Sequence, residues 1–374
     1  MKILYITSNL YPNTAYTNRN KAVVRGFKEH GCECDILSIR PVLTDEPLCL
    51  NNTIIPRSSK TKTLLYTAIN LMKVGKLVKH YDVVYCVTYT QPIVRVVSRK
   101  SLKYKKLSIH EGTEFPDIVY SLSNKSVKSL NSYLTDIKQF DKILAISHPL
   151  KDYFVEHGVP ADMIDIFPMI VDPHRFDDVK KQDVGFRYIA YCGNMNNSKD
   201  GIAELIEAFC KSNARKTHTL MLIGSNPMGT QKEVYDNLLA KYAIKDEIIF
   251  KGQVQRDDMP QLLMDADLLV LCRPNNRQAL GGFPTKLGEY LSTGNPVLVT
   301  RVGDMDKYII DGENGFLAEP DNIDGFAAKM DEVLADYDTA RQVGKKGREL
   351  TDTAFNYSVQ TKKIIDSIKT AINK

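Results

Sequence analysis

The residues best suited to chemistry lie together in the segment GGFPTKLGE, residues 281–289. Its glycines permit a tight turn, and Pro284 suits the first position of a helix, where its missing N–H costs nothing. The free N–H groups of that helix start, with the charge of Lys286, would bind a phosphate, and Glu289 one turn later would bind a ribose. The same pattern also fits a glycine-rich turn that caps a core helix. The candidate phosphate-binding residues are Gly282, Phe283, Pro284, Thr285 and Lys286.

A second polar turn, residues 191–201, follows a strand-like run and precedes a helix expected from 201 to 212. Gly193 and Asn194 open the turn, and Lys199 stands just before the helix. The segment also fits an ordinary surface turn with a solvated lysine. If both segments belong to one site, Lys199 and Lys286 converge on one diphosphate, and each charge-assisted contact contributes about 1.5–3 kcal/mol.

A histidine at the end of an expected strand, His110, is the third candidate. Single histidines are more often structural, but ligands bind outside the carboxyl ends of parallel strands, which favours a functional role here. Two Asp-x-Asp sequences, at 265–267 and 304–306, superficially resemble metal-binding motifs. The first leads into a buried strand, so we interpret both as structural and expect no metal site.

Short β-branched runs alternate with helical patterns along the 374 residues. The runs are almost continuously apolar, as in strands buried on both faces of a parallel sheet. This alternation predicts an α/β protein with two doubly wound, Rossmann-like domains that face a cleft. No apolar stretch of 18 residues occurs, so no membrane-spanning helix is expected. The expected strands are 2–7, 34–39, 82–88, 105–110, 142–147, 187–193, 220–224, 247–252, 268–272 and 296–300.

The segment 172–186 is the expected domain boundary. It has a proline, many charges and few apolar residues, as linkers do. We therefore expect an N-terminal Rossmann-like domain at 1–172 and a C-terminal one at 187–355. A final helix within 356–374 carries regularly spaced isoleucines and would pack on either domain.

Several of these segments resemble, in the correct order, motifs of the GT-B glycosyltransferases of family 4 (glycosyl transferases group 1). YCGNMNNSKDGIAELIEAF is similar to the family's VGRLxxxKGxxxLIxAF, and GGFPTKLGEYLSTGNPVLV lies where the family has its E-x7-E donor motif. ILAISHPLKDYFVEHGVPADMIDIFPMIVDPHRF is similar to the interdomain motif SxxLxxxLxxxGVxxxKIxVIPNGVDxxxF. Two further segments resemble family motifs, SNLYP after the first strand and DGENGFLAEPDN. The resemblance covers nearly the whole chain.

The resemblance implies roles for four of the candidates. Lys199 takes the place of the lysine that binds the donor diphosphate, and Glu289 takes that of the second E-x7-E glutamate, which holds the ribose hydroxyls. The loop 282–286 would offer its amides to the phosphates, and His110 matches a first-domain histidine near the reacting sugar. The N-terminal domain would bind the acceptor and the C-terminal domain the nucleotide sugar.

The sequence also departs from the family's pattern. Gly281 stands where the first E-x7-E glutamate is expected, and Asn194 stands where an arginine usually follows the glycine, Gly193 here, at the donor phosphates. The family's Gly-Gly acceptor loop is not apparent within 14–20. Lys286, which is not typical of the motif, would restore the missing positive charge.

The implied activity is transfer of a sugar from a UDP- or GDP-linked donor to a glycan or lipid-linked acceptor, with retention, in surface polysaccharide or glycan assembly. No metal and no further cofactor is expected, because Lys199, Lys286 and the helix start would stabilise the leaving phosphate. The alternatives are a GT-B-like sugar-nucleotide epimerase and a catalytically impaired pseudoenzyme that binds nucleotide, which Gly281 suggests. A nicotinamide enzyme is disfavoured because no G-x-G-x-x-G sequence follows any expected strand.

Positive charge is concentrated in the first half of the chain. Residues 55–110 hold 12 Lys and Arg against one acid, although the whole chain carries only +5. In this basic region, 57–106, the pattern of 61–80 fits a helix in contact with an anionic membrane, or an ordinary domain helix with a solvated face. Stacking aromatics are few, so nucleic acid is not an expected partner. Cysteines in apolar runs and an N-terminus that starts with a strand predict a cytoplasmic protein, at most at the inner face of the membrane.

Overall fold

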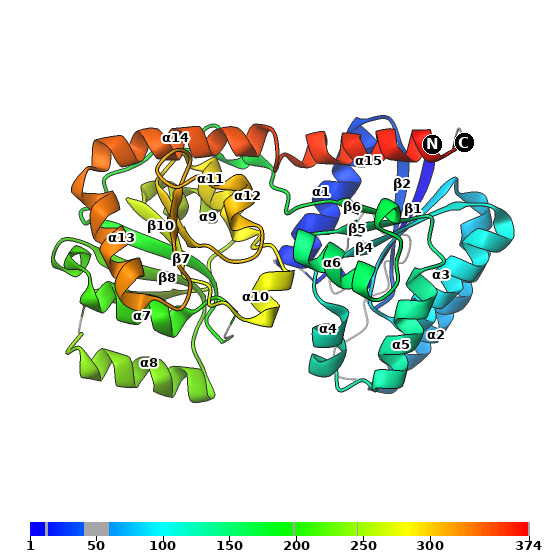
Figure 1. Ribbon diagram of the computed structural model, residues 1–374, viewed down its shortest axis with the longest axis horizontal. Helices are drawn as coiled ribbons and strands as arrows, with labels where there is room; N and C mark the ends of the chain where they lie inside the picture. Colours follow the sequence, from blue (N-terminus) through cyan, green and yellow to red (C-terminus); the bar gives the residue numbers. More distant parts are fainter. Residues whose placement is uncertain (12–13, 41–59, 197–198, 245, 373–374) are drawn as a thin grey trace. The chain divides into compact units, whose positions relative to one another are not determined.

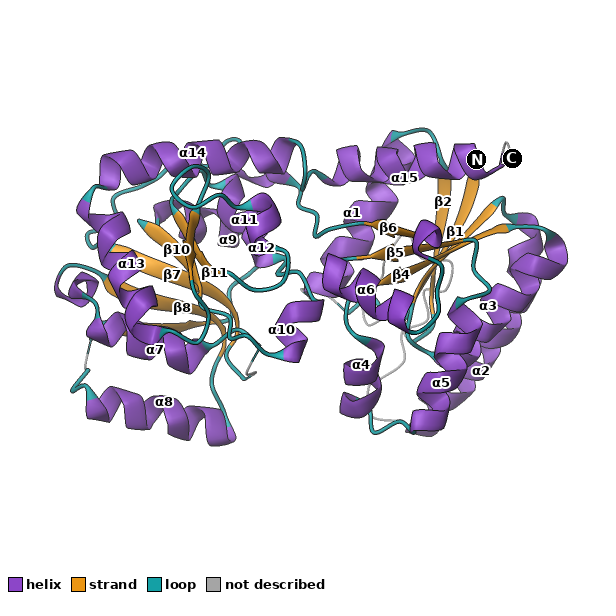
Figure 2. Ribbon diagram, in the orientation of Figure 1, coloured by secondary structure: helices purple, strands orange, loops and turns teal. Residues whose placement is uncertain are grey.

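The computed structural model describes residues 1–374 apart from 12–13, 41–59, 197–198, 245 and 373–374, and describes only the backbone of 60–67. The described residues form two compact units, one of Met1–Ile170 with Tyr357–Lys374 and one of Val171–Asn356. Each unit has one parallel sheet between layers of helices (Figures 1 and 2). The expected fold class, α/β with two doubly wound domains, is therefore confirmed.

The first unit is built on a six-stranded sheet in the order β2-β1-β3-β4-β5-β6. Its central strands are buried along their length because helices cover both faces, and every residue of β3 is buried. The strands are β1 (Lys2–Thr7), β2 (Glu33–Ser38), β3 (Val83–Val87), β4 (Leu107–Gly112), β5 (Lys142–Ala145) and β6 (Ile164–Ile166). The α-helices are α1 (Ala15–Glu29), α2 (Lys60–Leu77), α3 (Gln91–Tyr104), α4 (Pro116–Leu122), α5 (Val127–Ile137), α6 (His148–Glu156) and α15 (Tyr357–Ile372).

The second unit has a six-stranded sheet in the order β12-β11-β10-β7-β8-β9. The strands are β7 (Tyr188–Asn194), β8 (Thr219–Ser225), β9 (Ile248–Gly252), β10 (Leu268–Leu271), β11 (Val297–Thr300) and β12 (Phe316–Ala318). The α-helices are α7 (Ile202–Lys211), α8 (Gly229–Lys241), α9 (Met259–Asp265), α10 (Arg277–Gly281), α11 (Lys286–Ser292), α12 (Met305–Tyr308), α13 (Ile323–Ala335) and α14 (Tyr337–Asp352). A short 3-10 helix, Pro173–Phe176, precedes β7.

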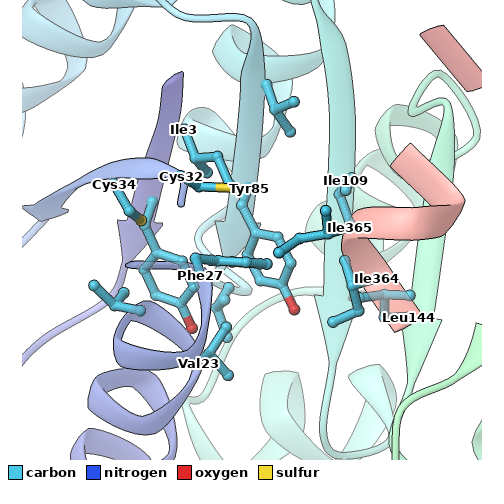
Figure 3. Close-up of a cluster of buried hydrophobic side chains, with 14 of the residues drawn as sticks. Ile3, Val23, Phe27, Cys32, Cys34, Tyr85, Ile109, Leu144, Ile364 and Ile365 are labelled. Atoms are coloured by element: carbon cyan, nitrogen blue, oxygen red, sulfur yellow. The ribbon is translucent and has the colours of Figure 1, made fainter. Parts of the chain in front are cut away.

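The C-terminal helix α15 belongs to the core of the first unit. Its spaced isoleucines Ile364, Ile365 and Ile368 are buried in one cluster with Phe27 of α1 and Tyr85 of β3 (Figure 3). The sequence pattern left open which domain this helix would join. Burial of three isoleucine side chains, each favourable by about 1.5–3 kcal/mol, explains why it returns to the first unit.

The segment 172–186, expected as a linker, belongs to the second unit instead. Several of its charged side chains pair with residues of that unit. Lys181 binds Asp267 at 2.5 Å, and Asp177 binds Arg348 at 2.8 Å. The polar segment 172–186 therefore lies close to the boundary, but the boundary itself falls after Ile170, before these residues.

Candidate functional site

The strand order of the second unit reverses between β7 and β10, because the chain proceeds from β7 to β8 and β9 on one side and from β10 to β11 and β12 on the other. At such a reversal the loops leave the carboxyl ends of adjacent strands in opposite directions and open a crevice for ligands. The loop after β7 leads into α7, and the connection after β10 leads through α10 to α11. These two connections carry both candidate lysines and Glu289.

Helix α11 is fixed to the end of β7 by a hydrogen bond and by core packing. The Tyr290 hydroxyl accepts from the backbone N–H of Cys192 at 2.7 Å. Phe283, in the loop before the helix, is buried against the rings of Tyr308 and Phe355. Phe283 therefore anchors the glycine-rich loop, and the side chains of α11 that face the end of β7 are held in a defined place.

The helix begins two residues later than the sequence indicated. Pro284 was expected at its first position, but α11 starts at Lys286, after Thr285. The carbonyl of Pro284 accepts a hydrogen bond from the N–H of Leu287 at 3.2 Å, so residues 284–287 form a turn that leads into the helix. As a result Lys286 opens the first turn, and Glu289 follows at the i+3 position on the same side.

The ammonium group of Lys286 lies over the end of β7. Its Nζ donates to Oδ2 of Asp200 at 2.5 Å and to the Tyr191 hydroxyl at 3.2 Å, and it stands 4.9 Å from the centre of the Tyr191 ring. A Cβ atom on Gly193 would come within 2.7 Å of this Nζ. The same Cβ would come still closer, to 2.2 Å, to the Tyr191 hydroxyl, so the glycine leaves room for both the tyrosine and the lysine at the strand end.

Asp200 is the buried centre of this cluster. It accepts hydrogen bonds from Lys286 and from the Tyr191 hydroxyl, the latter at 2.8 Å, and Nε of Arg273 lies 3.6 Å from its other oxygen. Burial alone would raise the pKa of the Asp200 carboxyl, but the Lys286 ammonium and then the Arg273 guanidinium lower it below its usual value. One carboxylate thus faces two cations, which leaves the cluster with a net positive charge.

Glu289 is paired with an arginine from the segment before β7. Its Oε1 accepts from Nη1 of Arg175 at 2.5 Å, and Nη2 of Arg175 donates to the carbonyl of Arg256 at 2.6 Å. Burial and then the Glu289 carboxylate raise the pKa of the Cys192 thiol to about 12, although the Lys286 ammonium acts in the opposite direction. Both charged residues of α11 therefore act on the same strand end.

The structure places Lys199 and Asn194 on either side of the turn after β7. Lys199 is half-buried, and its carbonyl accepts from Nε of Arg273 at 3.4 Å, so the arginine holds this backbone next to Asp200. The amide oxygen of Asn194 accepts from the Ser225 hydroxyl at 2.8 Å. Asn194 thus ties the turn to the end of β8, while Lys199 follows 197–198, which lie outside the described residues.

His110 belongs to the first unit and is fully buried in β4. Its Nε2 lies 2.7 Å from the Tyr133 hydroxyl, and the rings of Tyr89, Tyr133 and Phe140 surround it. Burial lowers the pKa of its imidazole to about 3, so the ring is neutral at physiological pH. The next residue, Glu111, forms a buried ion pair with Arg19 at 2.6 Å. A role of His110 toward a reacting sugar stays a prediction.

Both aspartates of the first Asp-x-Asp sequence, 265–267, have structural partners. Asp267 accepts from Lys181 at 2.5 Å and from Arg187 at 2.7 Å, and these pairs, with His218, hold the pKa of its carboxyl far below the usual value despite burial. Asp265 accepts from the backbone N–H of Gln182 at 2.7 Å. Among the described residues, no group of three or more His, Cys, Asp or Glu is arranged to hold a metal ion.

A cavity of about 240 Å³ lies in the first unit, between α15 and the strands β4 to β6. About half of its lining residues are aliphatic, such as Ile109 and Ile364, and the others include two lysines and two aspartates. Because the two carboxylates offset the charge of the lysines, and Lys142 already pairs with Asp165 at 2.7 Å, we do not place a diphosphate there.

Sequence reasoning missed the partners Asp200 and Arg175. A signal for the first was present. The family motif VGRLxxxKGxxxLIxAF can be aligned from either end. With its LIxAF on residues 205–209, its lysine falls on Asp200 and its glycine on Gly201. With its first glycine on Gly193, the lysine falls on Lys199. The one-residue disagreement marks the position of Asp200. No local pattern pointed to Arg175, which reaches Glu289 over 114 residues.

Comparison with known proteins decides the family. Residues 18–175 match the model of Glycosyltransferase Family 4, and residues 174–350 match that of Glycosyl transferases group 1. The chain belongs to the family 4-type glycosyltransferases of the GT-B fold. In this glycosyltransferase, Lys199, Lys286 and Glu289 lie in the part matched by the group 1 model, whereas His110 lies in the part matched by the family 4 model.

Individual relatives are distant in sequence. The glycosyltransferase is 23% identical over 316 residues to an uncharacterized glycosyltransferase of Methanocaldococcus jannaschii, covering 80% of this chain and 78% of the relative. It is 26% identical over 263 residues to the N-acetyl-alpha-D-glucosaminyl L-malate synthase of Bacillus anthracis, covering 68% and 64%. Its fold is similar to that of Anabaena HepE in complex with UDP and glucose, with a TM-score of 0.75, 17% identity and coverage of 99% and 100%.

Proposed function

We propose that this glycosyltransferase moves a sugar from a UDP- or GDP-linked donor to a glycan or lipid-linked acceptor, with retention, in the assembly of a surface polysaccharide or another glycan. The observation that carries the proposal is the placement of Lys286 and Glu289, three residues apart in the first turn of α11, at the strand-order reversal of the second unit. A cation and a carboxylate at this spacing suit the diphosphate and the ribose of one nucleotide.

The proposed chemistry follows from the charge that develops during transfer. When the bond from the anomeric carbon to the phosphate oxygen breaks, negative charge builds up on the leaving diphosphate. Positive groups already in place stabilise that charge in the transition state at little reorganisation cost. We assign this role to Lys286 and Lys199 without a metal ion, and we assign the ribose hydroxyls to Glu289.

The names of several relatives support a role in glycan assembly. One is a putative colanic acid biosynthesis glycosyltransferase of Salmonella typhimurium, 22% identical over 275 residues, and another is a lipopolysaccharide 1,2-N-acetylglucosaminetransferase of the same organism, 23% identical over 250 residues. Anabaena HepE was also determined with UDP-glucose. These names favour a nucleotide sugar as donor and a growing glycan as acceptor.

The first experiment is a thermal-shift screen of UDP-, GDP- and ADP-sugars, followed by a transfer assay with the stabilising donor. We expect one UDP- or GDP-sugar to raise the melting temperature and to be consumed in the presence of an acceptor, with equal rates with and without EDTA. A strict requirement for Mg²⁺ or Mn²⁺ would contradict the metal-free chemistry.

The second experiment tests the site residues. Lys199→Ala and Glu289→Ala should each reduce transfer at least about tenfold, since each removes one charge-assisted contact. Lys232→Ala is the matched control for the lysine, because it breaks an exposed pair with Asp236 on α8. Wild-type rates in both site variants would refute the assignment.

A pseudoenzyme that binds nucleotide is the second candidate. It is favoured by the buried Gly281, which stands where the family has a glutamate, so the sugar-facing carboxylate is missing at this position. Nucleotide binding without turnover in any acceptor screen would support it. Conversion of the donor sugar without added acceptor would instead indicate the epimerase.

We also propose peripheral contact with an anionic membrane through the basic region 57–106. Residues 57–59 lie outside the described residues, but α2 and α3 pack together and expose apolar side chains among lysines. Met72 is 64% exposed and Leu102 72% exposed, near the exposed Lys73 and Lys103 in sequence. Val74 and Val78 are buried, as in an ordinary domain helix. No described helix is both long and apolar enough to span a membrane.

Liposome flotation tests this contact. We expect binding to vesicles with anionic lipid that weakens with salt, because each basic residue near the surface contributes about 1 kcal/mol through a screened interaction. Met72→Ser with Leu102→Ser should weaken the binding further. Absence of binding to anionic vesicles at low salt would reject the proposal.

A further inference from the structure

Lys286 is held in place by a carboxylate that the proposed chemistry does not use. Nζ of Lys286 has a short contact of 2.5 Å to Oδ2 of Asp200, and this Nζ lies at the end of β7, where Gly193 leaves room for it. The Lys286 side chain is 16% exposed and that of Asp200 is 7% exposed. The ammonium therefore contacts a buried anion, while its side chain keeps some exposure to solvent.

The position of Asp200 in the chain makes this pair unusual. Counted from Leu205, the motif KGxxxLIxAF has its lysine at position 200. This chain carries a carboxylate there instead, and Lys286 of α11 contacts that carboxylate. Arg273, 3% exposed, lies 3.6 Å from the second oxygen of Asp200. Because two cations flank one anion, the exchange leaves the cluster positive.

Burial of the Lys286–Asp200 pair has a desolvation cost that a purely structural role does not explain well. Removing two charges from water is unfavourable, and a buried pair is often no better for stability than an apolar one. The pair has another advantage if the carboxylate orients the lysine toward a ligand, because Nζ is then restricted to one position before the ligand binds.

We propose that Asp200 is a positioning residue that acts through Lys286. It holds Nζ of Lys286 over Gly193, so that a lysine from α11 contacts the donor diphosphate in place of a lysine at position 200. The inference rests on the proposed function, because it needs a nucleoside diphosphate at the strand-order reversal. It predicts that the effect of changing Asp200 depends on whether residue 286 carries a charge.

The experiment measures the Kd for UDP, or for GDP if the donor screen selects it, by isothermal titration in the wild type and in variants of the full chain. Lys286→Met should weaken binding roughly tenfold or more. Adding Asp200→Asn to Lys286→Met should improve binding at least about threefold over Lys286→Met alone, because it removes a carboxylate that the Lys286 ammonium no longer separates from the phosphates. Asp200→Lys with Lys286→Met should bind more tightly still, since it returns the lysine to position 200.

The single variant Asp200→Asn shows the effect of removing the carboxylate while Lys286 is still present. With Lys286 present, it should lower kcat at least about threefold, because the lysine loses the charge that holds it. Tyr191→Phe is the matched control, since it removes the hydroxyl contact to both groups and leaves their charges. Melting temperatures of all variants establish that they fold.

The outcomes separate this inference from the proposed function. If the folded double variants bind no better than Lys286→Met, Asp200 does not act through Lys286 and the inference is overturned. If Asp200→Asn changes the Kd by the same factor in both backgrounds, the role of Asp200 is structural only, which also overturns it. If the wild type binds no nucleoside diphosphate at all, the proposed function itself fails.

Discussion

Arg175 reaches Glu289 across 114 residues of sequence and binds its carboxylate at 2.5 Å. The arginine comes from the 3-10 helix before β7 and the glutamate from α11, and the second guanidinium nitrogen donates to the carbonyl of Arg256. The side chains are 16% and 25% exposed, so the pair is partly shielded from solvent. The carboxylate assigned to the ribose is therefore oriented before any ligand binds.

Arg175→Gln should raise the KM for the donor several-fold, up to about tenfold, because Glu289 loses the partner that orients it. The effect on kcat should be smaller, since the ribose lies away from the bond that breaks. Steady-state kinetics at varied donor concentration measure both constants. Arg301→Gln is the control, since it breaks an ion pair with Glu319 in which both side chains are well exposed. Equal kinetics in the two variants would contradict the orienting role.

The burial of His110 predicts a pH dependence of stability. Its pKa is about 3 in the native state and near 6.5 in the unfolded chain, so between these values only the unfolded state binds the proton. The free energy of unfolding therefore decreases as the pH falls below 6.5, and this decrease reaches about 2 kcal/mol at pH 5. His110→Gln, which keeps a polar atom near Tyr133, should remove this part of the slope in urea unfolding between pH 5 and 8. The exposed His157→Gln is the control. An unchanged slope in His110→Gln would show that His110 is not a buried neutral group.

Gly201 at the start of α7 should tolerate no side chain. Its φ is +62°, and a Cβ atom would lie 1.9 Å from the carbonyl oxygen of Cys272. Gly31 has a similar φ of +76°, but a Cβ atom there would meet nothing within 4 Å. Gly31→Ala should therefore reduce the free energy of unfolding only by the backbone strain, about 1–2 kcal/mol. Gly201→Ala should cost at least about 2 kcal/mol more, because backbone must move. Urea unfolding of both variants measures the difference, and equal losses would contradict the tight contact between α7 and the end of β10.

Much of the fold follows from the sequence because strands buried on both faces are almost continuously apolar. All ten expected strands occur, most within one or two residues of their expected ends. Among the described residues, the strands that were missed are β6 (Ile164–Ile166) and β12 (Phe316–Ala318), which have three residues each and lie at sheet edges. Such segments are too short to show a periodicity, and their pairing is decided by the rest of the sheet.

The site was predictable only in part. Lys286 and Glu289 are one helical turn apart, so their common placement follows from local spacing. Their partners Asp200 and Arg175 come from distant segments, and the pairing of two charged residues leaves no periodic signal. For the same reason, the charges of 172–186 resembled those of a linker, although Lys181 and Asp177 form ion pairs within the second unit.

The most direct measurement is a crystal structure of the protein with the nucleoside diphosphate that the donor screen selects. We expect a diphosphate oxygen within hydrogen-bonding distance of Nζ of Lys286, close to Gly193, and a ribose hydroxyl on the carboxylate of Glu289. A nucleotide bound elsewhere, with no phosphate in reach of Lys286 and the Arg175–Glu289 pair closed off from the ribose, would contradict the assignment of this edge of the second sheet as the donor site.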